Sequence, residues 1–115
     1  MKNEKFKIAN TIKELIVRID DNLVNFPKKE IELKRKIKET SYDLLYIMYR
    51  ANVVSNVELK RELGETAIAQ VKYLDFLINL CYDKQIINAK KYVKFGESLN
   101  DIVRYIMAWI SNLNK

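Results

Sequence analysis

Pro27 is the only proline in this chain, and Gly64 and Gly96 are its only glycines. Proline and glycine are the residues that helices tolerate least, so a chain of 115 residues with so few of them can be helical almost throughout. That length is typical of one domain with one hydrophobic core. The sequence therefore predicts an all-α fold in a single domain that spans residues 1–115.

Apolar residues recur every three or four positions in four segments, which is the spacing of one helix face. The segments run to Phe26, from Pro27 to about Val53, from near Asn56 to Cys81, and from Asn88 to Leu113. The main face of the first helix is predicted to comprise Ile8, Ile12, Leu15, Ile16, Ile19, Leu23 and Phe26, and that of the second Leu33, Ile37, Leu44, Met48 and Ala51. The main face of the third is predicted to comprise Leu63, Ala67, Val71, Leu74, Leu77, Ile78 and Cys81, and that of the fourth Tyr92, Phe95, Leu99, Ile102, Ile106, Trp109 and Leu113. Four helices with short connections favour an antiparallel up-down-up-down four-helix bundle.

Three local signals predict where these helices begin. Proline is tolerated in the first turn of a helix, so we expect Pro27 to open the second helix. Ser55 and Glu58 fit the S-x-x-E capping box, which predicts that the third helix begins near Asn56. Asn88 is expected to cap the fourth.

A second apolar stripe lies outside the main faces, where an isolated bundle needs none. One interpretation is that these side chains are partly exposed and have no role, because single exposed apolar residues are common. We favour self-association, because two stripes on one helix call for two partners. The predicted oligomer interface comprises Tyr42, Tyr46 and Tyr49 of the second helix and Ala69, Tyr73, Phe76 and Leu80 of the third.

The net charge of +6 is concentrated in two segments. Residues 27–53 hold seven basic and four acidic side chains, and residues 84–115 hold six basic and two acidic ones. A basic surface attracts phosphate, although solvated lysines that keep a protein soluble are the alternative. The predicted nucleic-acid surface, contacting the backbone phosphates of RNA or DNA, comprises Lys28, Lys29, Lys34, Arg35, Lys38, Lys90, Lys91, Lys94 and Arg104.

The chain contains no histidine, so it cannot build a histidine metal site or a Ser-His or Cys-His nucleophile pair. Its single cysteine, Cys81, is expected to be a buried structural thiol. We therefore expect no enzymatic activity, no metal and no cofactor. The longest apolar run, 44–49, is far shorter than a membrane span, and the N-terminal MKNEKFK lacks the apolar stretch of a signal peptide. A cytoplasmic protein without a membrane partner is expected.

Two stretches resemble the accessory variability determinant proteins of diversity-generating retroelements, which are related to the four-helix proteins encoded in intervening sequences of ribosomal RNA. The first stretch is "NFPKKE" with Leu33, Ile37, Leu44, Leu45 and Ala51. The second is "DIVRYIMAWI", similar to the family's ending at Asp101, Ile102, Arg104, Ile106, Trp109 and Ile110. Val103, Met107 and Ala108 stand where the family has glycines, which predicts that close backbone packing there is either looser or replaced by side-chain packing. Asp75 and Asn79 replace family arginines, which leaves nucleic-acid contact by the third helix in doubt.

The resemblance implies a basic protomer of a ring-like homo-oligomer, hypothetically a pentamer. Such a ring would bind nucleic acid and a reverse transcriptase, and it would support mutagenic copying of a template RNA into a variable gene. Two other functions stay open on the sequence: a helical protein-binding adaptor, and a structural oligomer of the intervening-sequence type or a toxin–antitoxin-type partner.

Overall fold

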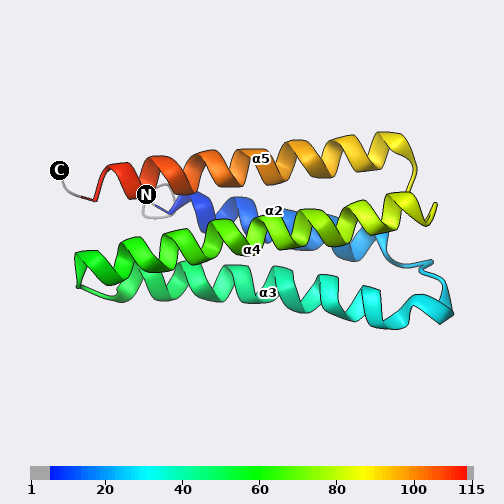
Figure 1. Cartoon of the computed structure of the whole chain (residues 1–115), viewed down its shortest axis with the longest axis horizontal. Coiled ribbons are helices and arrows are strands. Elements are labelled where there is room, and N and C mark those ends of the chain that lie inside the picture. Colours follow the sequence, from blue (N-terminus) through cyan, green and yellow to red (C-terminus); the bar gives the residue numbers. More distant parts are fainter. Residues whose placement is uncertain (1–5, 114–115) are drawn as a thin grey trace.

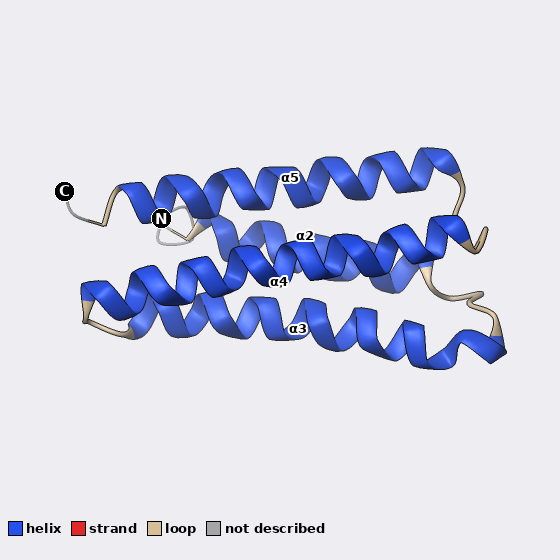
Figure 2. Cartoon of the chain, viewed as in Figure 1, coloured by secondary structure: helices blue, strands red, loops and turns tan. Residues whose placement is uncertain are grey.

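The protein consists of four long helices in a computed structural model that describes residues 6–113. The elements are α2 (Lys7–Asn22), the 3₁₀ turn η1 (Lys28–Glu30), α3 (Ile31–Val53), α4 (Val57–Asp83) and α5 (Ala89–Ser111). Within residues 6–113 there is no strand, only helices and the loops that join them (Figure 2). The all-α prediction is confirmed for the described residues.

The four helices lie side by side along the long axis of a particle that measures 46 × 22 × 21 Å (Figure 1). The links from α2 to α3 and from α4 to α5 lie at one end, and the link from α3 to α4 lies at the other (Figure 1). Helix α2 contacts α3 and α5, and α4 contacts the same two helices, whereas α3 and α5 do not touch. Helices α3 and α5 therefore occupy diagonal corners of the bundle.

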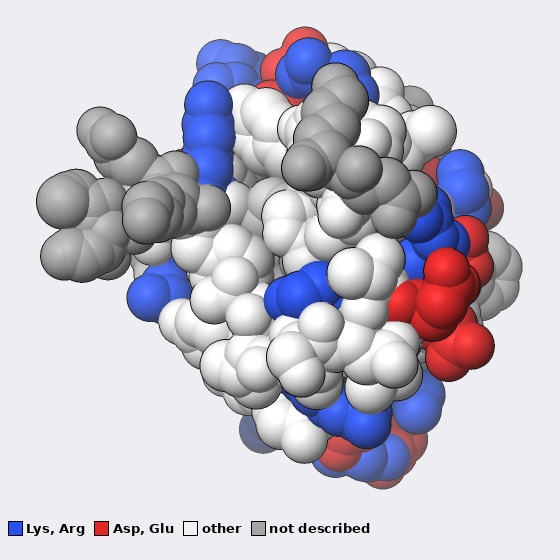
Figure 3. All heavy atoms as spheres, turned by 90° about the vertical axis from the view of Figure 1, so that its left-hand side faces the viewer, with Lys and Arg blue, Asp and Glu red and all other residues white. Residues whose placement is uncertain are grey.

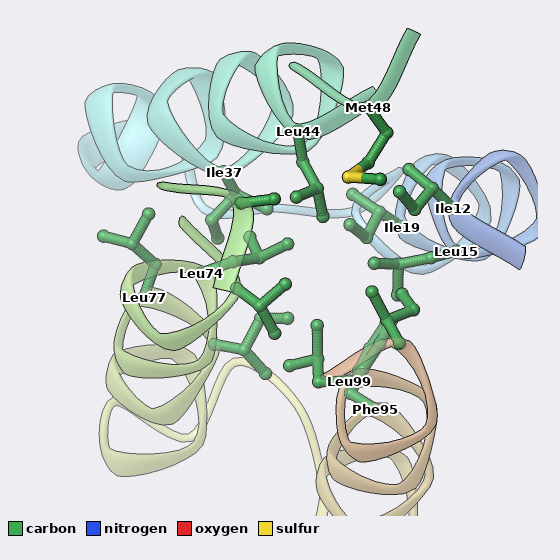
Figure 4. Packing of buried hydrophobic residues seen from close by; sticks show 14 of the residues in the cluster. Ile12, Leu15, Ile19, Ile37, Leu44, Met48, Leu74, Leu77, Phe95 and Leu99 are labelled. Atoms are coloured by element: carbon green, nitrogen blue, oxygen red, sulfur yellow. The ribbon is translucent and has the colours of Figure 1, made fainter. Parts of the chain in front are cut away.

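Side chains from all four helices converge on one core (Figure 4). All seven positions predicted for the main face of α4 are buried, as are Ile37, Leu44, Met48 and Ala51 of α3. In α5 the predicted positions Phe95, Leu99, Ile102 and Ile106 are buried, while Tyr92, Trp109 and Leu113 are partly buried. The periodicity thus identified most of the core, although it missed buried Ala9 of α2, Thr40 and Ser41 of α3, and Ile87 in the last connection.

The prediction of the first helix junction is wrong by several residues. Helix α2 ends at Asn22 instead of Phe26, and Pro27 precedes the turn η1 instead of opening a long helix. The residue before a proline is disfavoured in the α region, so the helix has to end before Phe26. Pro27 is extended, with φ −62° and ψ 137°, and the α-helix begins only at Ile31. Leu23 still reaches the core, which is why the apolar pattern extended beyond the helix.

The two predicted helix caps have different outcomes. Asn56, not Ser55, caps α4, because its side chain accepts a 2.8 Å hydrogen bond from the backbone N–H of Leu59. The Ser55–Glu58 capping box is therefore wrong by one residue. Asn88 caps α5 as predicted, accepting a 2.9 Å hydrogen bond from the Lys91 N–H. Both asparagines satisfy backbone donors that would otherwise lack a partner at a helix start.

Helix α4 ends in a motif that requires one left-handed residue. Gln85 has φ 64°, and it is the only non-glycine residue with positive φ among residues 6–113. The Ile86 N–H bonds the Cys81 carbonyl at 2.8 Å, and the Gln85 N–H bonds the Tyr82 carbonyl at 3.0 Å. This Schellman pattern satisfies the last carbonyls of the helix, and it turns the chain toward α5.

Candidate nucleic-acid interface

One cluster of predicted phosphate-binding residues lies on η1 and the first turn of α3. Lys28 and Lys29 are exposed and Lys34 is partly buried. None of the three has an ion-pair partner among the described residues. The turn is fixed by Pro27, whose carbonyl accepts a 3.0 Å hydrogen bond from the Glu30 N–H. These lysines are therefore held at a corner of the bundle with their charges uncompensated.

Three other predicted residues are already paired with carboxylates. Arg35 bonds both Glu32 and Glu39, the latter at 2.7 Å, and these hydrogen bonds raise the pKa of Arg35. Lys38 Nζ lies 3.4 Å from Asp20 of α2. Exposed pairs of this kind contribute little to stability, so a phosphate can displace them, but each pair weakens the local positive potential.

Arg104 of α5 is paired in the same way. Its guanidinium bonds Asp101 one turn earlier, which raises the pKa of Arg104. It lies ten residues beyond Lys94 along α5, so it is well separated from the lysines at the start of that helix. The structure therefore sets Arg35, Lys38 and Arg104 apart from the unpaired lysines.

A second unpaired cluster lies at the start of α5. Lys90, Lys91 and Lys94 are exposed and have no ion-pair partner in the described part of the chain. The dipole of α5 makes this end positive, so three lysines here cost some stability. A bound phosphate would offset that cost, because it accepts hydrogen bonds at a helix start and neutralises the lysines.

The two clusters lie at the same end of the bundle but at different corners. Helices α3 and α5 both begin at the right-hand end of the view in Figure 1, yet they do not contact each other. Residues 27–34 and 83–94, which form this end, hold seven lysines and three carboxylates. The sequence analysis omitted Lys84, which ends α4 here and lies 3.2 Å from Glu30. We call this end, with Lys28, Lys29, Lys34, Lys84, Lys90, Lys91 and Lys94, the basic end.

The opposite end of the bundle has a different surface. Figure 3 shows it face-on, with uncharged side chains across most of the visible middle, basic side chains among them and at the rim, and acidic side chains gathered at one side. Exposed Val53 and Val57 flank the α3–α4 link at this end. Lys60 donates a 2.9 Å hydrogen bond to the Ala51 carbonyl and lies 5.9 Å from the Trp109 ring, so it closes the end of α3. Like Lys7 and Lys13 of α2, Lys60 has no ion-pair partner among the described residues but lies over an aromatic ring, whereas the lysines of the basic end gather in two short segments.

The predicted oligomer interface is largely exposed. Tyr46 is 66% exposed and Phe76 is 53% exposed, and the rings of Tyr73 and Phe76 stack with centroids 6.5 Å apart. Tyr42 and Ala69 are also exposed, while Leu80 is partly buried against the core. Tyr49 packs beside Phe6, the residue before α2, with ring centroids 6.1 Å apart. Most of this surface is therefore available to a partner, and Leu80 contributes least.

Cys81 lies in the core beside Ile78 and Phe95, as the sequence predicted. Burial, with a smaller contribution from the charge of Glu30, raises the pKa of this thiol to about 11. A thiol of that pKa is neutral and a poor nucleophile near pH 7. Within residues 6–113 no three histidine, cysteine or acidic side chains gather closely enough to hold a metal ion. No helix in the same range has the length and apolar character to cross a bilayer.

The fold and the basic end together describe a small four-helix protein with a cationic surface. Comparisons with protein-family models, with curated proteins and with solved structures match nothing to this chain. Its resemblance to accessory variability determinants therefore rests on the sequence motifs alone. The stretch MKNEKFK, behind the prediction that no signal peptide is present, lies mostly outside the described residues.

Proposed function

We propose that this protein is a non-enzymatic accessory protein that binds RNA or DNA through backbone phosphates. In this proposal it is the protomer of a ring-like homo-oligomer, hypothetically a pentamer, of antiparallel up-down-up-down bundles. The ring binds a reverse transcriptase of a diversity-generating retroelement in the cytoplasm and supports mutagenic copying of a template RNA. The observation that carries the nucleic-acid part is the gathering of six unpaired lysines at one end of the bundle.

Unpaired lysines favour phosphate binding for a physical reason. Binding to nucleic acid derives much of its affinity from counterion release, so a lysine without a local carboxylate gains most from a phosphate. The sequence contains no aromatic base-stacking motif, and the two rings at the basic end, Tyr82 of α4 and Tyr92 of α5, stack on each other with centroids 4.5 Å apart. Binding is therefore expected to be strong at low salt and weakly selective for sequence.

The experiment compares two triple variants with a matched control. Lys28, Lys29 and Lys34 are changed to glutamine in one variant, and Lys90, Lys91 and Lys94 in the other. The control changes Lys13, Lys36 and Lys72, which lowers the net charge equally but lies outside both clusters. Each cluster variant should lower the slope of log K against log salt by about 2 to 3, from three lost phosphate contacts. Unrelated RNAs should be affected alike.

Two outcomes would contradict this proposal. If the wild-type protein binds no RNA at low salt, the lysines serve solubility or a protein partner. If the control variant loses as much affinity for RNA as the cluster variants, binding depends on the net charge of the protein and not on a particular surface. The gene neighbourhood tests the proposed role in a retroelement. A reverse transcriptase gene with paired template and variable repeats should lie near the gene for this protein.

The self-association part has its own test. Tyr73→Ser with Phe76→Ser removes two exposed rings from α4, and Val17→Ser with Val24→Ser removes two similarly exposed side chains from α2 and the turn after it. Sedimentation at micromolar concentration should give several times 13.7 kDa for the wild type and the α2 control. The α4 variant should give a smaller mass. A wild-type mass of 13.7 kDa would contradict the ring.

A protein-binding adaptor is the second candidate, and one observation favours it. Exposed Tyr73 and Phe76 stack on each other on α4, which carries an acidic excess. That combination suits a protein partner better than a phosphate backbone, because aromatic residues are enriched in protein interfaces. The adaptor becomes the better interpretation if RNA binding is absent while Tyr73→Ser leaves the mass of the protein unchanged.

A further inference from the structure

Helix α5 carries a second stripe that the bundle leaves uncovered. Val93, Gly96, Asn100, Val103 and Met107 follow one another at steps of 3, 4, 3 and 4, the spacing of a coiled-coil seam. Val93 is 54% exposed and Met107 is 57% exposed. The stripe borders a groove of about 360 Å³ between α5 and α4, whose other wall includes Val71, Lys72 and Asp75. We call these five residues the α5 stripe.

Packing within the four-helix bundle gives no reason for a glycine at position 96. A glycine inside a helix costs roughly 0.5–1 kcal/mol relative to alanine. A Cβ atom built at Gly96 would meet nothing within 4 Å, so the protomer does not require the absence of a side chain there. A close approach by another backbone is one reason for a glycine on a helix surface. Gly96 therefore indicates that something docks on the α5 stripe.

The α5 stripe is complementary to itself when reversed. We infer that two copies of the protein dock through their α5 helices, antiparallel to each other, with Asn100 at a two-fold axis. In that register Val93 of one copy lies opposite Met107 of the other, and Gly96 lies opposite Val103. The small residue faces a larger one, and each polar Asn100 meets its own counterpart. Such an isologous contact uses one surface patch twice.

The charges beside the stripe fit the same register. Glu97 and Arg104 are seven residues apart, so they lie on the same flank of α5. A two-fold axis at Asn100 brings Glu97 of each copy opposite Arg104 of the other, which makes two ion pairs. Glu97 has no ion-pair partner among residues 6–113, and Arg104 bonds only the exposed Asp101 of its own helix. A parallel arrangement would put these flanks of the two helices on opposite sides of the pair, so the two ion pairs could not form.

The lysines at the start of α5 gain from the antiparallel arrangement as well. In the single protomer Lys90 lies at the positive end of a helix dipole. In the pair, the start of one α5 lies beside the end of the other, where the dipole and the last carbonyls favour a cation. The contact spans about 21 Å of helix from Val93 to Met107 at 1.5 Å per residue. It goes beyond the proposed function, because the ring interface uses α3 and the far flank of α4.

The test is a crosslink that depends on the axis. Asn100→Cys places one exposed thiol at the axis, so two copies should form a disulfide in a mild glutathione buffer at low micromolar concentration. Glu65→Cys, at an exposed position of α4, is the matched control. A covalent dimer should form several-fold faster with Asn100→Cys than with Glu65→Cys. The wild type should not crosslink, because its only thiol is buried.

Charge reversal then tests the register. In the Asn100→Cys protein, Glu97→Lys alone and Arg104→Glu alone each put like charges opposite each other, so crosslinking should fall to the level of the Glu65→Cys control. The double reversal should restore it. With native Asn100, sedimentation should give a lower mass for each single reversal and the wild-type mass for the double. Circular dichroism checks that helicity is unchanged.

The inference is overturned by either of two results. One is crosslinking of Asn100→Cys that does not exceed that of Glu65→Cys. The other is crosslinking that both single reversals leave unchanged, which would place the contact elsewhere. Neither result bears on the RNA-binding measurements with the cluster variants, so the two proposals fail separately.

Discussion

Gly64 of α4 packs against Ile110 of α5 so closely that a Cβ atom at position 64 would lie 2.8 Å from the Ile110 Cγ1 atom. Trp109 is also near, with its Cζ3 atom 3.1 Å from the same point. Val103, Met107 and Ala108 of α5 stand where the resembled family has glycines. Here the glycine that permits a close approach between these helices lies on α4.

Gly64→Ala is expected to destabilise the protein by about 1 kcal/mol. Overpacking costs typically ~1–3 kcal/mol, and the better helix propensity of alanine offsets roughly 1 kcal/mol of it. Urea unfolding followed by circular dichroism measures the difference. Ile110→Ala should remove most of the penalty when combined with Gly64→Ala, and a double-mutant cycle without coupling would contradict the contact.

Gly96→Ala should have the opposite sign. Nothing lies within 4 Å of the added methyl group, so the variant should gain about 0.5–1 kcal/mol in free energy of unfolding. The free energy of unfolding has to be measured at a protein concentration where the chain is monomeric. A loss of stability there would mean that α4 and α5 approach more closely at Gly96 than the structure shows.

Gln85→Gly should stabilise the protein by roughly 1 kcal/mol. Gln85 has φ 64°, and side chains other than glycine lose about 1–2 kcal/mol in that left-handed region. Lys84→Gly is the control, because Lys84 has φ −85° and gains nothing from glycine. If thermal unfolding shows equal shifts for both variants, the left-handed conformation of Gln85 is not the cause.

Cys81 should react with a thiol reagent only when the protein unfolds. Its side chain is 1% exposed and its pKa is raised to about 11, so the thiolate is rare and inaccessible at pH 8. The reaction rate should therefore follow urea concentration through the unfolding transition. Fast reaction in native buffer would contradict burial.

The same raised pKa predicts a pH dependence. Below pH 9.0 the thiol is protonated in both the folded and the unfolded chain. Between 9.0 and about 11 the unfolded thiol loses its proton first, so the free energy of unfolding falls as pH rises through that window. Cys81→Ala lacks this contribution, and its stability should fall less steeply over the same range in urea titrations.

Leu44→Ala should cost about 2–5 kcal/mol, because Leu44 is fully buried among all four helices and leaves a cavity. Tyr46→Ala on the same helix should change the free energy of unfolding of a monomer by less than about 0.5 kcal/mol, since Tyr46 is 66% exposed. Chemical unfolding of both variants tests this contrast. A large loss for Tyr46→Ala that depends on protein concentration would assign its cost to self-association.

Much of the candidate site was visible in the sequence because charge and helix register are local properties. Lys28, Lys29 and the three lysines of early α5 could be predicted from their density alone. Their separation from Lys38 could not, because Lys38 meets Asp20 from a different helix, whereas both carboxylates that pair with Arg35 lie within four residues of it on α3. The α5 stripe has the same spacing of three and four residues as the main faces, and it overlaps the edge of the core. It can be recognised as a separate surface only because Val93 and Met107 are exposed in the structure.

The number of helices, their approximate limits and most of the side chains that fill the core could be predicted from the amino-acid sequence. These follow from propensity and from apolar spacing of three and four, which act within one segment. Only the tertiary structure decided that α3 and α5 are diagonal, and that Gly64 meets Ile110 while Gly96 meets nothing. Contacts between helices depend on how each one is rotated and shifted against its neighbour, and packing of the whole core sets those degrees of freedom.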